Sequence, residues 1–319
     1  MKAIRIHEYG GPEVLVTEDA PVPDLGEGEI LVRVHAAGVN PADRQIRAGL
    51  RQRLERPFTL ILGVDVSGVV EEVGHGVTGL APGDEVYGLP PGMGGYAEFV
   101  AALASSFARK PRSLDHVHAA ALPVVGLTAW QALFEVGGLS PGQTVLVHAA
   151  AGGVGHVAVQ LAKWRQATVI GTASARNEAF LRGLGVDEFI DYRTTRFESV
   201  VREVDLVLDA IPREADAATD ALAEETIERS WGVLNDGGML VSICTTPVPN
   251  AAAAARGMHG AYAHAQARGD FLERIAGLVD AGNVKPVVST VLPLEESRRA
   301  HELIQTGHAR GKIVLQVKS

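Results

Sequence analysis

A short run of alanines and glycines carries the clearest chemical signal in this chain. The segment TVLVHAAAGGVGHVAVQLAK, residues 144–163, contains the spacing Ala150-x-Gly152-x-x-Gly155. Its first residues are β-type and apolar, and apolar residues at helical spacing follow the glycines, which predicts a strand, a tight turn and a helix. Small residues there let backbone N–H groups and the positive end of the helix dipole approach a pyrophosphate. The pattern predicts a dinucleotide-binding turn that holds the pyrophosphate with Ala151, Gly152, Gly153, Val154 and Gly155.

The residues after the next expected strand favour one dinucleotide over the other. In such domains an acid about 20 residues past the glycines binds the ribose 2′-OH of NAD. The window GTASARN, residues 171–177, has no carboxylate and offers Ser174 and Arg176 instead. A hydroxyl and a guanidinium suit a 2′-phosphate, which an acid would repel. We therefore expect NADP(H) as the cofactor. Two alternatives stay open: Arg176 could be only a solvated residue at a helix start, and the glycine turn could belong to another kind of α/β domain.

Two regions of different periodicity must position these residues. The first ~120 residues contain short β-type segments punctuated by Gly and Pro, which is typical of a small barrel-like domain. From residue 119 onward, strands alternate with helices, which predicts βαβ units and a doubly wound parallel sheet. The tail returns to strand patterns. We expect an α/β fold with a β-barrel domain over 1–118, which 284–319 rejoins, and a Rossmann domain over 119–283.

Individual elements follow from the same patterns. Strands are expected over 2–7, 29–39, 66–74, 84–89, 97–102, 144–148, 168–173, 188–192, 204–211, 238–243, 285–293 and 311–317. Helices are expected over 119–138, 177–184, 216–231, 271–281 and 294–306. The structure of the segment 211–230 is left open.

Composition excludes several classes of protein. The formal charge of −9 argues against a nucleic-acid surface, which needs clustered Lys and Arg. No run of about 18 apolar residues predicts a membrane span, and no signal peptide is visible. A single cysteine, Cys244, excludes an internal disulfide and a multi-cysteine zinc site, and is typical of a reducing compartment. We expect a cytoplasmic protein.

Several motifs, in order, resemble one family. AAGVNPADRQIRAG (36–49) is similar to the Asn-Pro-x-Asp segment of zinc-free quinone oxidoreductases, a branch of the medium-chain dehydrogenase/reductase superfamily. GVDVSGVVEEVG (63–74) and PGDEVYG (82–88) resemble the barrel signature of that superfamily. Further matches are GGYAEFV (94–100), LPVVGLTAWQAL (122–133), HAAAGGVG (148–155) and HARGKIVL (308–315). The resemblance covers nearly the whole chain and implies a GroES-like β-barrel catalytic domain beside the Rossmann domain.

The resemblance implies catalytic residues in the early barrel. Asn40 is expected near the nicotinamide ribose or the acceptor oxygen, and Asp43 matches the acid of the same segment. Each has a structural alternative: Asn40 can start an Asn-Pro turn, and Asp43 can cap the short helix that follows. Gln45 is expected to face the substrate. Quinone-active relatives often carry tyrosine at that position, so the acceptor remains open between a quinone and an enone.

The resemblance also implies further cofactor contacts. Thr128 is expected near the nicotinamide and Tyr192 near the 2′-phosphate, while Lys312 follows a glycine in the terminal strand. Ser242 and Ile243 end a strand of the parallel sheet, whose carboxyl edge borders the ligand crevice. Each of these residues also has a structural alternative. The Thr128 hydroxyl could bond to its own helix, and the Tyr192 ring could cover the core. Ser242 and Ile243 could fill the core, and Lys312 could be an exposed strand residue.

No metal is expected. The resemblance places Asn40 to Asp43 and GVDVSG where zinc-dependent members carry their Cys, His and Glu ligands. The pair His116-x-His118 is the remaining candidate, and such a pair is more often solvated or packed. Without a metal, no Lewis acid activates an alcohol. We therefore expect hydride transfer to an acceptor that is already electrophilic. No residue stands out as the source of the proton.

These points predict an NADPH-dependent reductase of a small-molecule quinone or α,β-unsaturated carbonyl. The alternatives are a biosynthetic enoyl reductase and an NADPH-binding sensor or structural protein without turnover. The loops over 45–57 and 90–95 are expected to shape the acceptor pocket. Because members of the family often pair their cofactor domains edge to edge, we expect a homodimer through the Rossmann domain, with GMHGAYAHAQA (257–267) supplying the edge strand.

Overall fold

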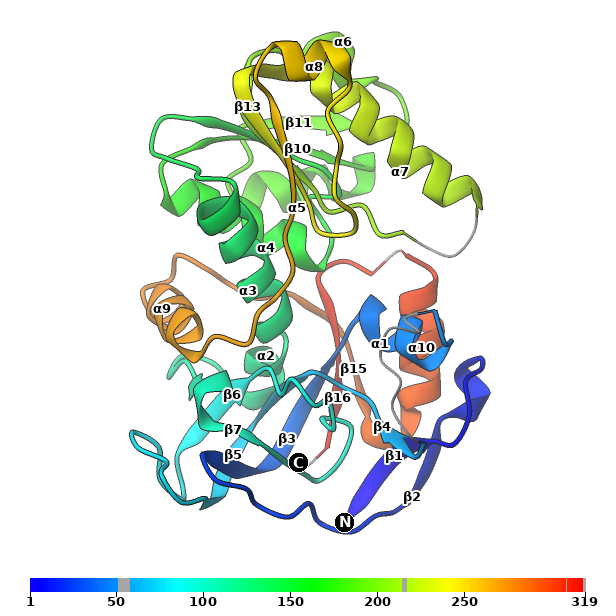
Figure 1. The fold of residues 1–319 in the computed structure, drawn as a ribbon, viewed down its shortest axis with the longest axis vertical. Helices are drawn as coiled ribbons and strands as arrows, with labels where there is room; N and C mark the ends of the chain where they lie inside the picture. Colours follow the sequence, from blue (N-terminus) through cyan, green and yellow to red (C-terminus); the bar gives the residue numbers. More distant parts are fainter. Residues whose placement is uncertain (51–57, 214–216, 308, 318–319) are drawn as a thin grey trace. The chain divides into compact units, whose positions relative to one another are not determined.

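The chain divides into two compact units in the computed structural model, which describes residues 1–50, 58–213, 217–307 and 309–317. Figure 1 shows its elements coloured along the sequence. The first unit comprises Met1–Leu127, Ala267–Gly282 and Pro286–Ser319, and the second comprises Thr128–Gln266 and Asn283–Lys285.

The first unit is built around the long strand β3. Its 11 residues, Glu29–Val39, coincide with the strand predicted over 29–39. Strands β5, β7 and β16 pair with β3 in antiparallel register, and the seven-stranded sheet has the order β15-β16-β3-β5-β6-β8 with β7 also on β3. The bounds are β5 Asp65–Val73, β6 Glu85–Gly88, β7 Phe99–Leu103, β8 Phe107–Arg109, β15 Val288–Pro293 and β16 Lys312–Gln316. The terminal strands thus join the sheet formed by the first hundred residues.

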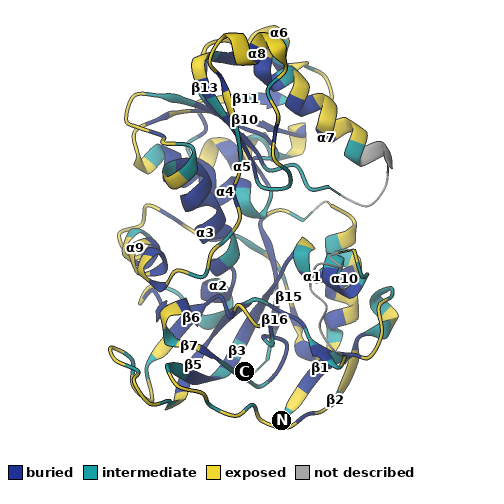
Figure 2. Ribbon diagram, in the orientation of Figure 1, coloured by how far each residue is buried: buried dark blue, intermediate teal, exposed yellow. Residues whose placement is uncertain are grey.

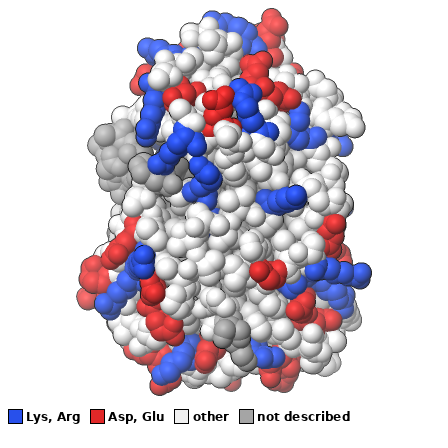
Figure 3. Space-filling model, turned by 180° about the vertical axis from the view of Figure 1, so that it is seen from behind, with Lys and Arg blue, Asp and Glu red and all other residues white. Residues whose placement is uncertain are grey.

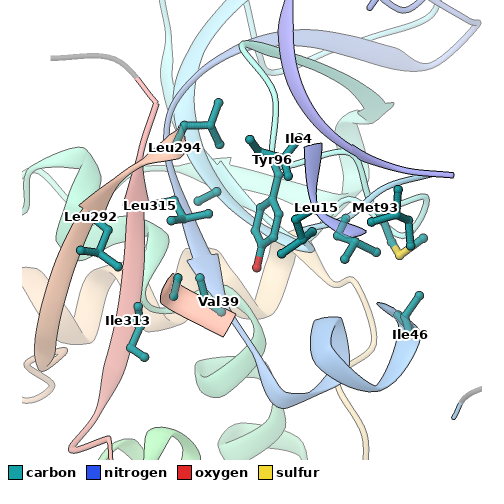
Figure 4. Packing of buried hydrophobic residues seen from close by; sticks show 14 of the residues in the cluster. Ile4, Leu15, Val39, Ile46, Met93, Tyr96, Leu292, Leu294, Ile313 and Leu315 are labelled. Atoms are coloured by element: carbon teal, nitrogen blue, oxygen red, sulfur yellow. The ribbon is translucent and has the colours of Figure 1, made fainter. Parts of the chain in front are cut away.

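A small second sheet and two helices complete this part of the core. The sheet has the order β2-β1-β4, with β1 at Lys2–Ile6, β2 at Val16–Asp19 and β4 at Leu60–Ile61. Helix α1 covers Pro41–Arg47 and α10 covers Ser297–Gln305. Figure 4 shows how buried residues from both ends of the chain pack together, among them Ile4, Val39, Tyr96, Leu292 and Ile313. Burial of this shared apolar surface stabilises the return of the tail to the first unit.

The second unit contains a six-stranded parallel sheet. Its strand order is β11-β10-β9-β12-β13-β14, which is the order of a doubly wound dinucleotide-binding sheet and confirms the predicted fold class. The strands are β9 Thr144–Val147, β10 Thr168–Ala173, β11 Glu188–Asp191, β12 Val204–Asp209, β13 Leu234–Ser242 and β14 His259–Tyr262. The helices are α4 Gly153–Trp164, α5 Glu178–Gly183, α6 Phe197–Val200, α7 Ala217–Ser230 and α8 Ala251–Ala255. In Figure 2 the central strands are buried, whereas α7 exposes much of its outward side.

Two expectations about helices were wrong in detail. The helix predicted over 119–138 is observed as α2 (His116–Ala120), α3 (Pro123–Trp130) and a π-helical turn over Gln131–Val136. Pro123 has no N–H to continue α2 but suits the first position of a new helix. Helix α9, Gly269–Asp280, was expected in the Rossmann domain but belongs to the first unit. The Tyr87 hydroxyl donates a hydrogen bond to Leu272 O (2.6 Å), and a Cβ on Gly269 would lie 2.3 Å from Phe107 O, so α9 packs tightly on that unit.

Among the described residues, no helix is long and apolar enough to cross a bilayer. On the face drawn in Figure 3, Lys and Arg side chains lie in patches beside patches of Asp and Glu. The visible surface therefore carries charges of both signs.

Candidate functional site

The predicted dinucleotide turn lies between β9 and α4 in the second unit. Ala149 takes a left-handed conformation (φ 52°) and α4 begins at Gly153. A Cβ on Gly155 would lie 2.4 Å from Ala149 O, so only glycine allows the helix to approach the turn this closely. Within the described residues, the first N–H of the helix to meet an acceptor is that of His156, which donates to Gly152 O (3.1 Å). The preceding N–H groups are those that a pyrophosphate would accept from.

The predicted 2′-phosphate residues come together at the next two strand ends. Ser174 directly follows β10, and Arg176 lies in the 3₁₀ turn after it. Tyr192 directly follows β11, and its N–H donates to Ala173 O (3.3 Å). Ser174 is buried, whereas the side chains of Arg176 and Tyr192 are exposed. The carboxyl edge of two adjacent parallel strands thus carries two hydroxyls and a guanidinium.

Arg193, which was not among the predicted residues, also lies at this edge. Its guanidinium carbon lies 5.9 Å from the centroid of the Tyr192 ring, within reach of a cation–π contact. Its N–H donates to the carboxylate of Asp191 (3.1 Å). Its position next to Tyr192 was a signal that could have identified it.

Ser242 and Ile243 lie at the carboxyl end of β13, as predicted. The Ser242 hydroxyl donates to Asp209 Oδ2 (2.8 Å), and Ile243 N donates to Asp209 O (3.1 Å). Burial raises the pKa of Asp209, which ends β12. Because the Ser242 hydroxyl is fully buried and engaged with Asp209, a cofactor contact here would use backbone atoms.

His148, which the sequence analysis did not select, supports the turn from inside the sheet. Its ring nitrogens lie 3.1 Å from Thr172 Oγ1 and 3.1 Å from Ser230 Oγ. Burial lowers the pKa of the imidazole to about 3. The neutral ring therefore joins β9, β10 and α7 directly before the small residues of the turn.

Asn40 and Lys312 meet in the first unit, together with a third residue, Asp65. Asn40 precedes α1, Asp65 begins β5 and Lys312 begins β16, and all three are buried. Lys312 Nζ donates to Asn40 Oδ1 (2.5 Å) and to Asp65 Oδ2 (2.9 Å). Asn40 Nδ2 donates to the same Asp65 oxygen (2.9 Å). Asp65 was missed, although an acid within the apolar run LILGVDVSGVV was a visible signal.

Asp43 holds the backbone of Asn40. Its Oδ2 accepts from Asn40 N (2.8 Å) and from the Tyr96 hydroxyl (3.1 Å). Burial raises the pKa of the Asp43 carboxyl to about 6, and the charge of Asp65 adds to the effect. Asp43 is fully buried and stands at the third position of α1. It therefore caps this helix, which was the structural alternative considered for it.

The remaining predicted residues lie in two helices. Gln45 is half-buried in α1 of the first unit, and Thr128 is buried within α3 and counts with the second unit. Residues 51–57 of the loop expected to shape the acceptor pocket lie outside the described residues.

The candidate histidine pair does not converge on one point. His116 Nδ1 lies 2.8 Å from Ser67 Oγ, and its ring stacks on His35 with 4.4 Å between centroids. His118 Nδ1 instead lies 2.7 Å from Asp115 Oδ1. Burial lowers the pKa of His116 to about 4. Across the described part of the chain, no three His, Cys, Asp or Glu side chains are grouped as a metal site would require.

A cavity of about 290 Å³ lies elsewhere in the first unit. Its lining includes Met1, Arg5, Pro21 and Phe99, and none of the predicted site residues. Arg5 there pairs with Glu18 (2.8 Å). The cavity shows no grouping of reactive side chains.

A GroES-like sheet and a Rossmann sheet with a glycine turn, in one chain, define the medium-chain dehydrogenase/reductase class. Family comparison agrees. Residues 26–112 match the family described as alcohol dehydrogenase GroES-like domain, and residues 184–315 match the one described as zinc-binding dehydrogenase.

Individual relatives show which branch of this superfamily the chain resembles. The chain is 36% identical to the mouse (Mus musculus) protein named NAD(P)H oxidoreductase RTN4IP1, mitochondrial, over 99% of this chain and 89% of that protein. It is 33% identical to Mus musculus quinone oxidoreductase, over 99% and 97% of the two chains. Among solved structures, the quinone oxidoreductase from Coxiella burnetii superposes with a TM-score of 0.88 at 35% identity, covering 100% and 99%. Escherichia coli quinone oxidoreductase complexed with NADPH gives 0.84 at 28% identity, covering 99% and 100%.

This chain therefore belongs to the quinone oxidoreductase branch of the medium-chain dehydrogenase/reductase superfamily. Its relatives support an oxidoreductase activity.

Proposed function

We propose that the protein is an NADPH-dependent reductase that transfers a hydride to a quinone or to an α,β-unsaturated carbonyl. The observation that carries this proposal is the edge of β10 and β11, where Ser174, Arg176 and Tyr192 gather and the window 171–177 has no carboxylate. A phosphorylated ribose fits this set of groups, whereas the ribose of NAD would lack its acidic partner. The NADPH complex of the Escherichia coli relative supports the same choice.

The chain's own groups would bind and orient the cofactor. The N–H groups of Gly153 to Gly155 would bind the pyrophosphate at the start of α4, and the Arg176 guanidinium would bind the 2′-phosphate. Bound NADPH supplies a hydride to an electrophilic acceptor. Since quinones and enones delocalise the charge that develops on their oxygen, the protein needs mainly positioning and hydrogen-bond donors.

Asn40 would provide such a donor. Its Nδ2 carries two protons, one of which goes to Asp65 (2.9 Å). We assign the other to the acceptor oxygen or to the nicotinamide ribose. Asp43 then acts as a positioning residue, because its fully buried carboxylate holds the Asn40 backbone.

A turnover assay tests which class of acceptor the protein reduces. Purified protein is mixed with NADPH and a panel of quinones and enones, and the loss of NADPH absorbance is followed. We expect turnover of at least one member of the panel, and Gln45→Tyr is expected to change the preference between the two acceptor classes. Tight NADPH binding with no acceptor turned over would contradict the proposal and favour a non-catalytic NADPH-binding protein. Turnover restricted to enoyl thioesters would favour a biosynthetic enoyl reductase.

We also propose a homodimer formed through the Rossmann unit. Strand β14 lies at one end of its sheet order and pairs with β13 on one side. Exposed edge strands pair readily with a second copy. Tyr262 in this strand is 41% exposed in the single chain, which is consistent with a side chain that a second copy would cover.

We also propose a cytoplasmic location, because the single cysteine fits a reducing compartment.

A further inference from the structure

A buried ion pair beside Asn40 takes no direct part in the proposed hydride transfer. Asp65 and Lys312 are 0% and 3% exposed, and Lys312 Nζ lies 2.9 Å from Asp65 Oδ2. We propose that these two residues are positioning residues that fix which way the amide of Asn40 points. The inference rests on the proposed function, in which Asn40 donates to the acceptor or to the ribose.

The three groups differ in whether they donate or accept hydrogen bonds. An ammonium can only donate hydrogen bonds, and a carboxylate can only accept them. Lys312 Nζ lies 2.5 Å from Asn40 Oδ1, while Asp65 Oδ2 lies 2.9 Å from Asn40 Nδ2. Turning the amide by half a rotation would set Nδ2 against the ammonium and Oδ1 against the carboxylate. Both contacts would be repulsive, so one orientation of the amide is selected.

The pair is itself hydrogen-bonded to the backbone of two other segments. Asp65 Oδ1 accepts from Val124 N (2.6 Å), and Lys312 Nζ also donates to Val39 O (3.1 Å). A Cβ on Gly38 would lie 2.8 Å from Asp65 Oδ2 and 2.6 Å from Ala120 O. The absent side chain at Gly38 thus keeps space for the carboxylate. Side-chain hydrogen bonds thus hold residues that are 25 and 272 positions away in sequence against Asn40.

A purely structural role is the competing explanation. Buried ion pairs are weak evidence for stability, because desolvation offsets much of their attraction. The two explanations predict different activities for a variant in which both charged residues of the pair are replaced by neutral ones. Asp65→Asn/Lys312→Met removes both charges of the pair together, yet an asparagine at position 65 can both donate and accept, so it no longer selects one amide orientation.

The first test is kinetic. Four proteins are compared with NADPH and 1,4-naphthoquinone: wild type, Asp65→Asn/Lys312→Met, Asn40→Ala and the triple variant. We expect the double variant to lower kcat by about 10- to 100-fold while KM for NADPH stays within about twofold. We expect the triple variant to match Asn40→Ala, because residues that act through Asn40 add nothing once its amide is gone.

The matched control is another ion pair within the same sheet. Arg33 in β3 and Glu71 in β5 pair at the surface (3.0 Å). Arg33→Gln/Glu71→Gln is expected to leave kcat unchanged. A folded Asp65→Asn/Lys312→Met protein with wild-type kcat would overturn the inference. A triple variant whose losses simply multiply would overturn it as well.

The second test needs neither turnover nor a folded variant of the pair. The side-chain amide protons of Asn40 are followed by NMR in the cofactor-free wild-type protein and assigned by their loss in Asn40→Ala. A held amide gives one proton that exchanges slowly with water and two well-separated signals. Two rapidly exchanging signals typical of exposed asparagine would overturn the inference. If wild type reduced no acceptor with NADPH, the proposed function would fail while this measurement still decided the positioning role.

Discussion

At the scale of single residues, the account depends most on Arg176. Its guanidinium is exposed at the end of β10, beside Ser174. A charge-assisted hydrogen bond to a 2′-phosphate contributes about 1.5 kcal/mol, which corresponds to about tenfold in affinity. Arg176→Ala is therefore expected to raise KM for NADPH by about tenfold and to change KM for NADH by less than about twofold.

Steady-state kinetics with both cofactors measures this effect. Arg182→Ala is the matched control, because Arg182 pairs with Glu178 (2.8 Å) on α5 and is not assigned to the cofactor. Equal changes in the two KM values for Arg176→Ala would show that the guanidinium does not recognise the phosphate.

The carboxyl of Asp43 gives a prediction about pH. Burial raises its pKa from 3.8 to about 6, so between these values the folded protein binds more protons than the unfolded chain. Linkage then requires that this group lower the free energy of unfolding as pH rises through that window, by about 3 kcal/mol in total. Asp43→Asn removes the titration.

Denaturant unfolding from pH 4 to pH 7 is the measurement. We expect the wild type to lose about 2 kcal/mol of that total relative to Asp43→Asn across this range. Parallel pH profiles for the two proteins would show that the carboxyl does not titrate in this window.

At the scale of elements, the junction of β9 and α4 is the most constrained. A Cβ on Gly155 would lie 2.4 Å from a backbone oxygen, and backbone cannot move aside cheaply. Gly155→Ala is expected to lower the free energy of unfolding by about 2 kcal/mol and to weaken NADPH binding. Gly183→Ala, at the end of α5, meets nothing within 4 Å and is the control.

We expect Gly183→Ala to be neutral or to stabilise by up to about 1 kcal/mol. Chemical denaturation measures both variants, and fluorescence quenching measures NADPH binding. If the two substitutions had the same effect, the close approach of α4 to the turn would be wrong.

Much of the fold was predictable because the signals are local. Alternation and β-branched residues identified β3 and β10 to the residue, and glycine spacing located the turn before α4. The break at Pro123 and the placement of α9 were not predicted. The position of α9 depends on contacts such as that of Tyr87 with Leu272, which join residues 185 positions apart.

The candidate site was predicted from two kinds of signal. Spacing along the chain selected the residues of the glycine turn, Ser174 and Arg176, whereas the family resemblance selected Tyr192 and Thr128. The sequence did not point to Asp65, Tyr96, Asp209 and His148, because their hydrogen-bond partners are distant in sequence. Lys312 was selected as a cofactor residue, yet its ammonium binds Asn40 and Asp65 inside the protein.

At the scale of the whole molecule, the prediction concerns assembly. The proposed homodimer extends the sheet of the Rossmann unit across β14. Sedimentation is expected to give about twice the 33.6 kDa of the chain. Ala263 N donates to Ser242 O (3.0 Å), so the alternate N–H groups of β14, including that of Ala261, face β13 and that of Tyr262 faces the other side. Tyr262→Pro removes this outward donor and is expected to shift the protein toward monomer. Wild type that sediments at the chain mass would contradict the dimer.

The central claim is that this oxidoreductase recognises the extra phosphate of NADPH. The most direct measurement is the pair of dissociation constants for NADPH and NADH, determined by fluorescence quenching on one preparation of the wild-type protein. We expect NADPH to bind at least about tenfold more tightly than NADH. Equal affinities, or tighter binding of NADH, would contradict it.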